Sequence, residues 1–234
     1  AARRDEGVLG ARGALWALRA RDLFTVAIGP APTHTLGPLR AAALFADTAA
    51  AIEAEVGPVE LKHLANSGGV LGHPETWLDM VRPGIMIYGS LPDPQAQRTV
   101  DLRPGLEFTT RVSFVKPVAA GETIGYGRTF VAPADTWIAT IPAGYGDGYS
   151  RLLSNRGRVL IGGVSYPIAG RVCMDQTMID LGPEPVAAVG DEAVLIGRRG
   201  DAEITAENVA ELMGTIPYEV TCLITQRVTR EAID

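Results

Sequence analysis

Two tyrosines of this sequence each stand between two glycines, a setting that suits a placed phenol better than a packed one. They are Tyr126, in the sequence GYGRT at 125–129, and Tyr145, in the sequence GYGDGY at 144–149. Flanking glycines allow backbone conformations that a side chain would exclude, and a phenol carries a proton that it can give or take. A turn tyrosine that caps a β-domain would explain either block alone. A third block, GRVCMDQ at 170–176, follows in order, and the three together favour a site for chemistry.

Composition and charge describe a globular protein and exclude several functions. The chain is 47% hydrophobic and 21% charged, which is typical of a packed domain. A net charge of −6 with two lysines argues against a nucleic-acid partner. No apolar run approaches the ~20 residues of a membrane helix, and no signal-type core follows the first residues. We therefore expect a cytoplasmic protein with no membrane partner. Cys173 and Cys222 lack metal-ligand spacing, so neither a metal site nor a disulfide framework is expected.

The elements that must position the blocks are of two kinds, and the first kind precedes residue 92. Its pattern predicts an early helix over 14–20 and a strand over 23–28, then a long amphipathic helix over 38–56 that Gly57 and Pro58 end. A buried strand over 59–64, one or two helical turns over 75–80 and another strand over 85–88 should follow. This order is typical of a parallel α/β fold. Because a (β/α)8 barrel needs about 250 residues, at most the last third of one fits here.

Beyond a proline-containing linker, short β-branched runs separated by glycine, proline and aspartate predict strands, at 108–116, 137–141, 158–161, 164–172, 176–181 and 192–196. A helix over 206–213 should follow, capped by Thr205 and Gly214, and Pro217 should open a last helix that ends near Thr225. The predicted fold class is α/β plus all-β. Its parts are a remnant of a (β/α)8 barrel over 1–92, a linker over 93–103 and a mainly antiparallel β-domain over 104–234.

The three blocks together resemble the carboxy-terminal part of the bacterial alanine racemases. The resemblance extends from about residue 59 to about residue 230, through HLANS at 63–67, VRPGIMIYG at 81–89 and GTIPYEV at 214–220. It implies interconversion of L-alanine and D-alanine through an aldimine with pyridoxal 5'-phosphate, which supplies D-alanine for peptidoglycan. It also implies a homodimer in which the β-domain of each chain faces the barrel of its partner.

By this resemblance, Tyr126 is one of the two bases that move the α-proton, and the lysine that holds the cofactor is the other. An ordinary phenol, with a pKa of about 10, is a poor base, so the family places a barrel histidine near it; that histidine has no counterpart here. Arg82 would lie against the pyridine nitrogen. Since a guanidinium only donates, the nitrogen would stay unprotonated and side reactions would be restrained. His63 would orient Arg82, although a lone histidine in an apolar strand is more often a core residue.

The remaining assignments concern the cofactor phosphate and the substrate. The resemblance gives the phosphate a serine hydroxyl, two backbone amides and a phenol, from Ser67, Gly84, Ile85 and Tyr218. Met174 would meet the alanine carboxylate through its backbone amide, with Cys173 beside it. Tyr145 and Tyr218 would narrow the passage into the site and select a methyl-sized side chain.

The cofactor lysine of the family also has no counterpart in this sequence. The family lysine stands in a Lys-x-Asn-Ala-Tyr-Gly context, and neither Lys62 nor Lys116 matches it. We therefore expect this chain alone to be inactive, as a racemase shortened at its amino end would be. The alternative is a non-catalytic β-domain, a binding or structural module left by truncation.

Overall fold

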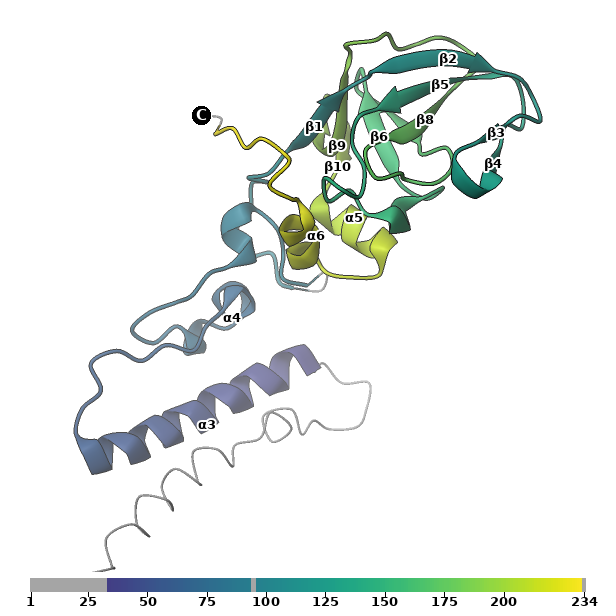
Figure 1. Ribbon diagram of the computed structural model, residues 1–234. Helices are drawn as coiled ribbons and strands as arrows, with labels where there is room; N and C mark the ends of the chain where they lie inside the picture. Colours follow the sequence, from purple (N-terminus) through teal and green to yellow (C-terminus); the bar gives the residue numbers. More distant parts are fainter. Residues whose placement is uncertain (1–32, 94–95, 233–234) are drawn as a thin grey trace, which may run out of the picture. The chain divides into compact units, whose positions relative to one another are not determined.

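A computed structural model describes residues 33–93 and 96–232, which divide into two compact units (Figure 1). The first unit holds 33–83 together with 97–99. The second holds 84–93, 96 and 100–232. The elements predicted over 14–20 and 23–28 lie outside the described residues. None of the described helices combines the length and apolar character needed to cross a bilayer.

The first unit is built on α3 (Thr33–Val56), which confirms the long helix predicted over 38–56. Gly57 ends it with a φ of 90° and donates its N–H to the carbonyl of Glu53 at 2.9 Å, a left-handed termination that glycine adopts without steric cost. A second, short helix, α4 (Ser67–Gly72), begins after Asn66, whose side chain accepts from the Gly69 amide. The capping asparagine therefore sets where the HLANS sequence turns into helix.

The strand predicted over 59–64 is wrong. Its only ladder contact among the described residues is a single parallel bridge between His63 and Met80, and Leu61 is exposed rather than buried. A strand is stabilised by a hydrogen-bonded neighbour, which an apolar run cannot specify by itself. The helical turns predicted over 75–80 shorten to the 3-10 helix η1 (Pro74–Thr76).

The strand predicted over 85–88 is also wrong, because these residues form the 3-10 helix η2 (Ile85–Tyr88) in the second unit. A four-residue apolar run is equally compatible with strand and helix. Gly89 decides between them: it ends the helix with a φ of 81° and donates to the Met86 carbonyl at 3.1 Å. A Cβ at Gly89 would lie 1.9 Å from the Arg103 carbonyl oxygen, so this tight turn requires glycine.

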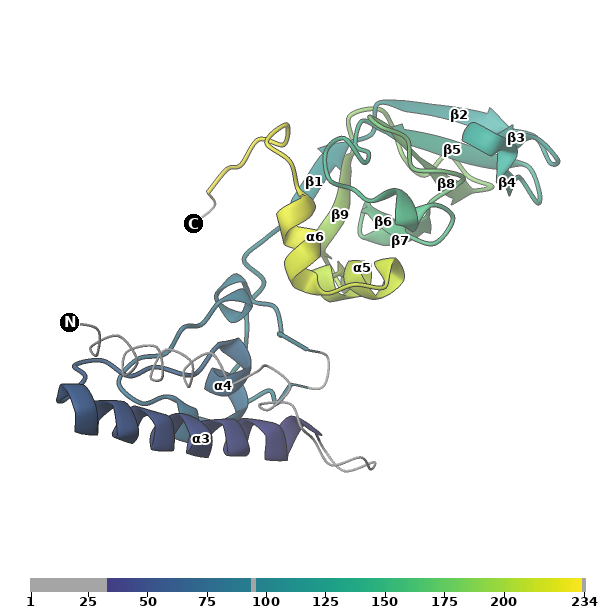
Figure 2. The ribbon, with the colours of Figure 1, turned by 60° about the horizontal axis from the view of Figure 1, so that its bottom comes forward.

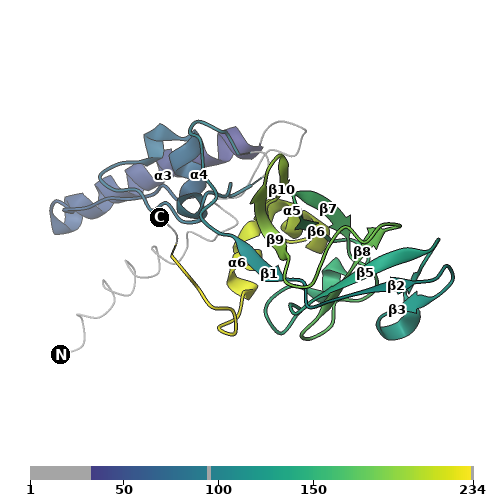
Figure 3. The ribbon, with the colours of Figure 1, turned by 90° about the horizontal axis from the view of Figure 1, so that it is seen from above.

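The rest of the second unit is the mainly antiparallel β-domain that the sequence predicts. Its ten strands are β1 (Phe108–Arg111), β2 (Phe114–Val118), β3 (Thr123–Ile124), β4 (Phe130–Val131), β5 (Thr136–Ile141), β6 (Arg158–Ile161), β7 (Val164–Pro167), β8 (Thr177–Gly182), β9 (Glu192–Arg199) and β10 (Ala202–Ile204). They form one sheet in the order β1-β9-β6-β7 with β10 on β9, a second in the order β2-β5-β8, visible side by side in Figure 3, and the hairpin β3-β4. Every strand pair is antiparallel.

Two predicted strands of this domain differ most from the structure in their limits. The run over 108–116 is split, because Val112 donates to the Asp191 carbonyl and Ser113 to the Thr140 carbonyl, which directs β1 and β2 into different sheets. The run over 164–172 ends as a strand at Pro167. Gly170, with a φ of 85°, then turns the chain away from the ladder.

The domain core lies between the sheets and the two predicted carboxy-terminal helices, α5 (Ala206–Met213) and α6 (Pro217–Leu223). Both helices lie on the same side of the strands (Figure 2). Thr205 and Asn208 form a capping box at the start of α5, and Gly214 ends it in the left-handed region. Fully buried Ile179 and Leu195 pack in the same cluster as the helix residues. Each such side chain contributes roughly 1.5–3 kcal/mol through burial.

An exposed ion-pair group lies on β9, where the Arg199 guanidinium forms salt bridges with Glu192 at 2.7 Å and with Glu107 at 3.0 Å. The hydrogen bond from Arg199 lowers the pKa of Glu192 below its ordinary value of 4.5, against the opposing effect of burial. Since a lowered folded-state pKa adds stability above the unfolded value, that stability should disappear as pH falls below 4.5. We expect Glu192→Gln to lower the free energy of unfolding at neutral pH by less than about 1 kcal/mol, because the pair is so exposed. The thermal midpoint should fall accordingly at neutral pH and should not change in acid.

The matched control is Glu211→Gln on α5, an exposed glutamate without an ion pair in the described structure. Thermal midpoints measured from neutral pH down through 4.5 should follow the parent for Glu211→Gln. A loss in Glu192→Gln that stays constant over this range would contradict the linkage.

Candidate functional site

The first block forms the tip of the β3-β4 hairpin in the second unit. Tyr126 opens the 3-10 helix η3 (Tyr126–Arg128), and its side chain is 74% exposed. Gly125, Gly127 and Arg128 all have positive φ angles, of 75°, 73° and 51°. A turn with these angles explains the glycine on each side of the tyrosine, because positive φ is costly for residues with a Cβ. The phenol is therefore presented outward from a tight turn rather than packed in the core.

The third block lies against the base of this turn. A Cβ placed on Gly125 would lie 3.4 Å from the amide nitrogen of Arg171. A Cβ placed on Gly170 would lie 2.8 Å from the carbonyl oxygen of Ile124. The backbones approach so closely that only glycine fits at Gly170, and the residues before and after Tyr126 are thereby held against the segment that carries Cys173 and Met174.

The second block is hydrogen-bonded to the third, backbone to backbone. Tyr145 donates its N–H to the Cys173 carbonyl at 3.0 Å, and Gly146 donates to the Met174 carbonyl at 2.8 Å. A Cβ on Gly144 would lie only 2.2 Å from the Cys173 carbonyl oxygen. All three blocks thus meet in one part of the β-domain, although 125–129 and 170–176 are far apart in sequence.

The groups left available by these contacts are a phenol, an amide and a thiol. The Met174 N–H has no hydrogen-bond partner within 33–93 and 96–232, and its side chain is 53% exposed. Burial raises the pKa of the Cys173 thiol and so favours its protonated form, and the positive charge of Arg151 opposes this effect. Tyr145 is 42% exposed. An amide that lacks an internal acceptor beside two exposed aromatic or apolar side chains suits a small anionic ligand.

Arg227 links the second and third blocks through ion pairs. It was not identified from the sequence. Its guanidinium lies 2.6 Å from Asp175 and 3.4 Å from Asp147, which follow Met174 and Gly146 in the third and second blocks. Thr225 adds backbone and hydroxyl bonds to Asp147 and Gly146. No local signal marks Arg227, because its acidic partners lie 52 or more positions away. Asn155 was also missed, because its side-chain partners lie 15 and 26 positions away.

In the first unit, the residues matched to the cofactor are His63, Ser67 and Arg82. Arg82 donates from its guanidinium to the Leu64 carbonyl at 3.4 Å and from its backbone to Ala65 at 2.9 Å. The ring nitrogen Nδ1 of His63 is buried and has no partner among the described residues, and no bond links it to Arg82. Ser67 is 1% exposed at the first turn of α4. A guanidinium with most of its donors unused fits a ligand that brings a heterocyclic acceptor.

The two remaining cofactor residues and Tyr218 belong to the second unit. Gly84 precedes η2 and Ile85 opens it; the Ile85 N–H has no hydrogen-bond partner in the described part of the chain. Tyr218 is half-buried in the first turn of α6, after Pro217. Its phenol makes no hydrogen bond to another described residue. These donors suit phosphate oxygens, which accept from amides and hydroxyls.

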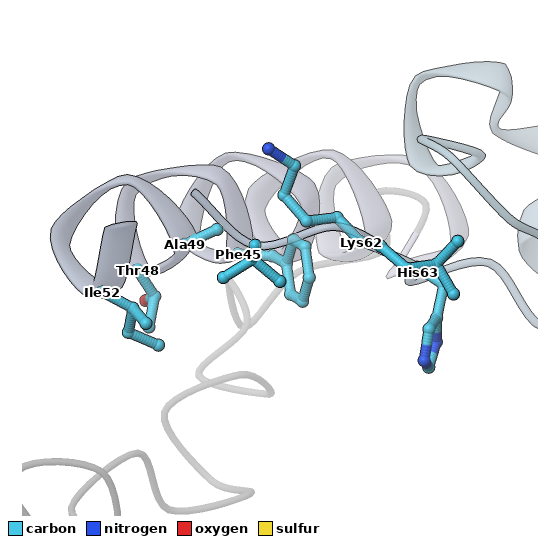
Figure 4. A pocket seen from close by; sticks show the side chains of 8 residues that line it. Phe45, Thr48, Ala49, Ile52, Lys62 and His63 are labelled. Atoms are coloured by element: carbon cyan, nitrogen blue, oxygen red, sulfur yellow. The ribbon is translucent and has the colours of Figure 1, made fainter. Parts of the chain in front are cut away.

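The two lysines of the sequence are Lys62 and Lys116. Lys62 precedes His63, but the two side chains leave the backbone on opposite sides (Figure 4). Its ammonium lies 2.9 Å from Glu53, whose hydrogen bond raises the pKa of Lys62. That ion pair holds the amine in the protonated form, which cannot attack an aldehyde. Lys116 is exposed in the middle of β2. Over the described ranges, no three His, Cys, Asp or Glu side chains come together as metal ligands.

Comparison with known proteins places this fold and these residues in one family. Residues 106–232 match the family model "Alanine racemase, C-terminal domain", and residues 36–92 match "Alanine racemase, N-terminal domain". The chain belongs to the alanine racemase family, whose members are pyridoxal-phosphate-dependent isomerases. The family predicted from the three glycine-containing blocks is thus confirmed.

Individual relatives align with most of this chain, but the aligned part is only about half of their own length. The alanine racemase of Cutibacterium acnes is 54% identical over 186 residues, which are 80% of this chain and 49% of the relative. Alanine racemase 2 of Caldanaerobacter subterraneus is 46% identical, with 80% and 48% covered. The solved alanine racemase of Streptomyces coelicolor superimposes with a TM-score of 0.78 at 35% identity, over 86% of this chain and 52% of that one. The chain spans about half the length of the curated relatives it matches.

Proposed function

We propose that this chain supplies one half of an alanine racemase site, in which Tyr126 is one of the two bases that interconvert L-alanine and D-alanine. The observation that supports this most strongly is the meeting of the three blocks in one part of the β-domain. One block presents the exposed Tyr126 phenol, and another carries the Met174 amide, which has no partner among the described residues. Two solved relatives hold ligands: the Bacillus anthracis alanine racemase has bound L-Ala-P, and the Clostridium difficile alanine racemase is a complex with cycloserine.

Pyridoxal 5'-phosphate, when bound, supplies the electron sink that makes removal of an α-proton feasible at neutral pH. Arg82 would donate to the pyridine nitrogen and keep it unprotonated, since a guanidinium does not give up its proton. The His63 ring, whose Nδ1 is buried, would orient Arg82. The phosphate would be held by a hydroxyl, two amides and a phenol, from Ser67, Gly84, Ile85 and Tyr218.

Tyr126 would take or give the α-proton at its phenolic oxygen, on the face opposite the second base. The Met174 amide would bind the substrate carboxylate, with the neutral Cys173 thiol beside it. Tyr145 and Tyr218 would limit the site to a side chain the size of a methyl group. Turn geometry supports the first of these roles, because the η3 turn presents the phenol while anchoring the backbone on each side.

The second base and the covalent cofactor attachment would come from residues that this sequence does not contain. Lys62 is held as an ion pair and Lys116 lies within the β-domain, so the 234 residues by themselves should not racemise alanine. The homodimer implied by the family would bring Tyr126 of one subunit to the lysine of the other.

The test is to supply the missing half. We expect the chain alone, with pyridoxal phosphate, to form no D-alanine, and a fusion to the amino-terminal half of the Cutibacterium acnes relative to racemise L-alanine. Borohydride reduction followed by mass spectrometry should then place the cofactor on a lysine of the added half and on neither Lys62 nor Lys116.

A fusion that folds, binds the cofactor and still does not racemise alanine would refute the proposal and favour a non-catalytic β-domain. Reduction that fixes the cofactor on Lys62 would contradict the reading of the Glu53 ion pair. Fusing the same amino-terminal half to the relative's own carboxy-terminal half provides the positive control.

A further inference from the structure

A single asparagine connects the Tyr126 turn to the third block through its side chain and its backbone. Asn155 lies between η4 (Arg151–Leu153) and β6, and its φ of 56° is in the left-handed region. Asparagine tolerates this conformation better than most residues. Position 155 therefore does not require glycine. Its asparagine side chain can both donate and accept a hydrogen bond.

The two ends of the Asn155 amide group make different bonds. Its Oδ1 accepts from the Gly170 N–H at 2.7 Å, and its backbone N–H donates to the Gly170 carbonyl at 3.0 Å. Its Nδ2 donates to the hydroxyl of Thr129 at 3.1 Å, and more weakly to the Thr129 carbonyl at 3.4 Å. Acceptor and donor thus contact the third and first blocks at the same time.

Thr129 is the point where such an anchor has most effect on Tyr126. Gly127 and Arg128 both have positive φ, and Thr129 is the first residue after them with an ordinary φ, of −81°. The preceding side of the turn is held by the close approach of Gly170 to Ile124. On the following side, Asn155 adds side-chain bonds to the β3-β4 pairing.

We propose that Asn155 is a positioning residue, whose amide holds the Tyr126 turn at Thr129 while it holds the third block at Gly170. The inference rests on the proposed function in one respect: the hydrogen bonds of Asn155 would keep the Tyr126 phenol oriented toward the substrate. The anchor itself is a property of this chain and can be measured without cofactor or activity.

The experiment uses amide hydrogen exchange by NMR on the 234-residue chain. Asn155→Asp keeps the oxygen that accepts from Gly170 and loses the donor to Thr129. Loss of one hydrogen bond of this kind corresponds to about fivefold, so the amides of residues 128–130 should exchange about fivefold faster. The Gly170 amide and those of β5 and β8 should keep the parent rate, which shows that the fold is intact.

Thr129 gives the reciprocal variants. Thr129→Val removes the acceptor hydroxyl and should accelerate the same amides, whereas Thr129→Ser keeps the hydroxyl and should behave as the parent. The double variant Asn155→Asp with Thr129→Val should exchange no faster than Asn155→Asp, because both remove one shared bond. Fluorine NMR of a 3-fluorotyrosine-labelled chain should show the Tyr126 signal, assigned by its loss in Tyr126→Phe, shifted in Asn155→Asp.

Asn208→Asp is the matched control, because Asn208 uses its Oδ1 as an acceptor from Thr205 and an aspartate retains that role. Equal acceleration of the turn in Asn208→Asp, or no acceleration in Asn155→Asp and Thr129→Val, would overturn the inference. If racemisation fails in the fusion while the exchange pattern holds, the proposed function falls and the anchor stands. If racemisation succeeds and the exchange pattern fails, only the anchor is refuted.

Discussion

Replacing Tyr126 with phenylalanine in the fusion that carries both halves of the site should lower racemisation by roughly 10²–10⁴-fold, the usual effect of removing a general base. The substitution removes one oxygen from a side chain that is 74% exposed, so folding should be unaffected. Proton abstraction from L-alanine should suffer the full loss. Exchange of the D-alanine α-proton with solvent should partly survive, because the base on the other face is intact. Deuterium incorporation into each enantiomer, measured separately, distinguishes the two effects.

The matched control is Tyr166→Phe on β7, a half-buried tyrosine whose hydroxyl makes no hydrogen bond to another described residue. It should racemise as fast as its parent. A Tyr126→Phe fusion that also matches its parent would show that the phenol is not one of the two bases.

Gly144→Ala should destabilise the β-domain by about 3 kcal/mol, at the upper end of overpacking effects. The added Cβ would lie 2.2 Å from the Cys173 carbonyl oxygen and 2.6 Å from that of Met174. Both are backbone atoms that accept from Tyr145 and Gly146, so relief of the clash must break the bonds between the second and third blocks. The midpoint of urea unfolding should fall accordingly.

Unfolding of the β-domain can be followed by the fluorescence of Trp137 on β5, with Trp16 and Trp77 replaced by phenylalanine. Gly105→Ala is the control, because the nearest atom to its added Cβ would lie 3.6 Å away and its φ is not positive. It should cost less than about 1 kcal/mol. Equal losses in the two variants would mean that the contact between Gly144 and the Cys173 carbonyl has no special role.

The β-domain was predictable from the sequence because its signals are local. Thr205 and Gly214 bound α5 as capping chemistry requires, and β8 buries Thr177, Ile179 and Leu181 in strict alternation. Segments whose conformation depends on distant partners were not predictable. The run over 59–64 lacks a ladder among the described residues, and the run over 85–88 is held as a 3-10 turn by the contact of Gly89 with Arg103.

The candidate site shows the same division between local and distant information. The glycines around Tyr126 and Tyr145 mark tight turns and could be read directly, and the structure brings both turns to the third block. Asn155 could not be read, since it looks like an ordinary turn residue and its side-chain partners lie 15 and 26 positions away. Nor could the pairing of Arg227 with Asp175, because exposed arginines and aspartates carry no pairing signal of their own.

The pairing of β1 with β9 has a consequence for the order of assembly during synthesis. Its register sets Phe108 opposite Ile196, and all three blocks lie between these residues in the chain. Closing so long a loop carries an entropic cost before any contact compensates for it. On the ribosome, the sheet cannot close until β9 has emerged, so the Tyr126 turn is made long before the framework that holds it. Ribosome-bound chains arrested before residue 192 should therefore be degraded by protease within the β-domain. Chains that carry, after residue 234, an added linker long enough to fill the exit tunnel should resist it.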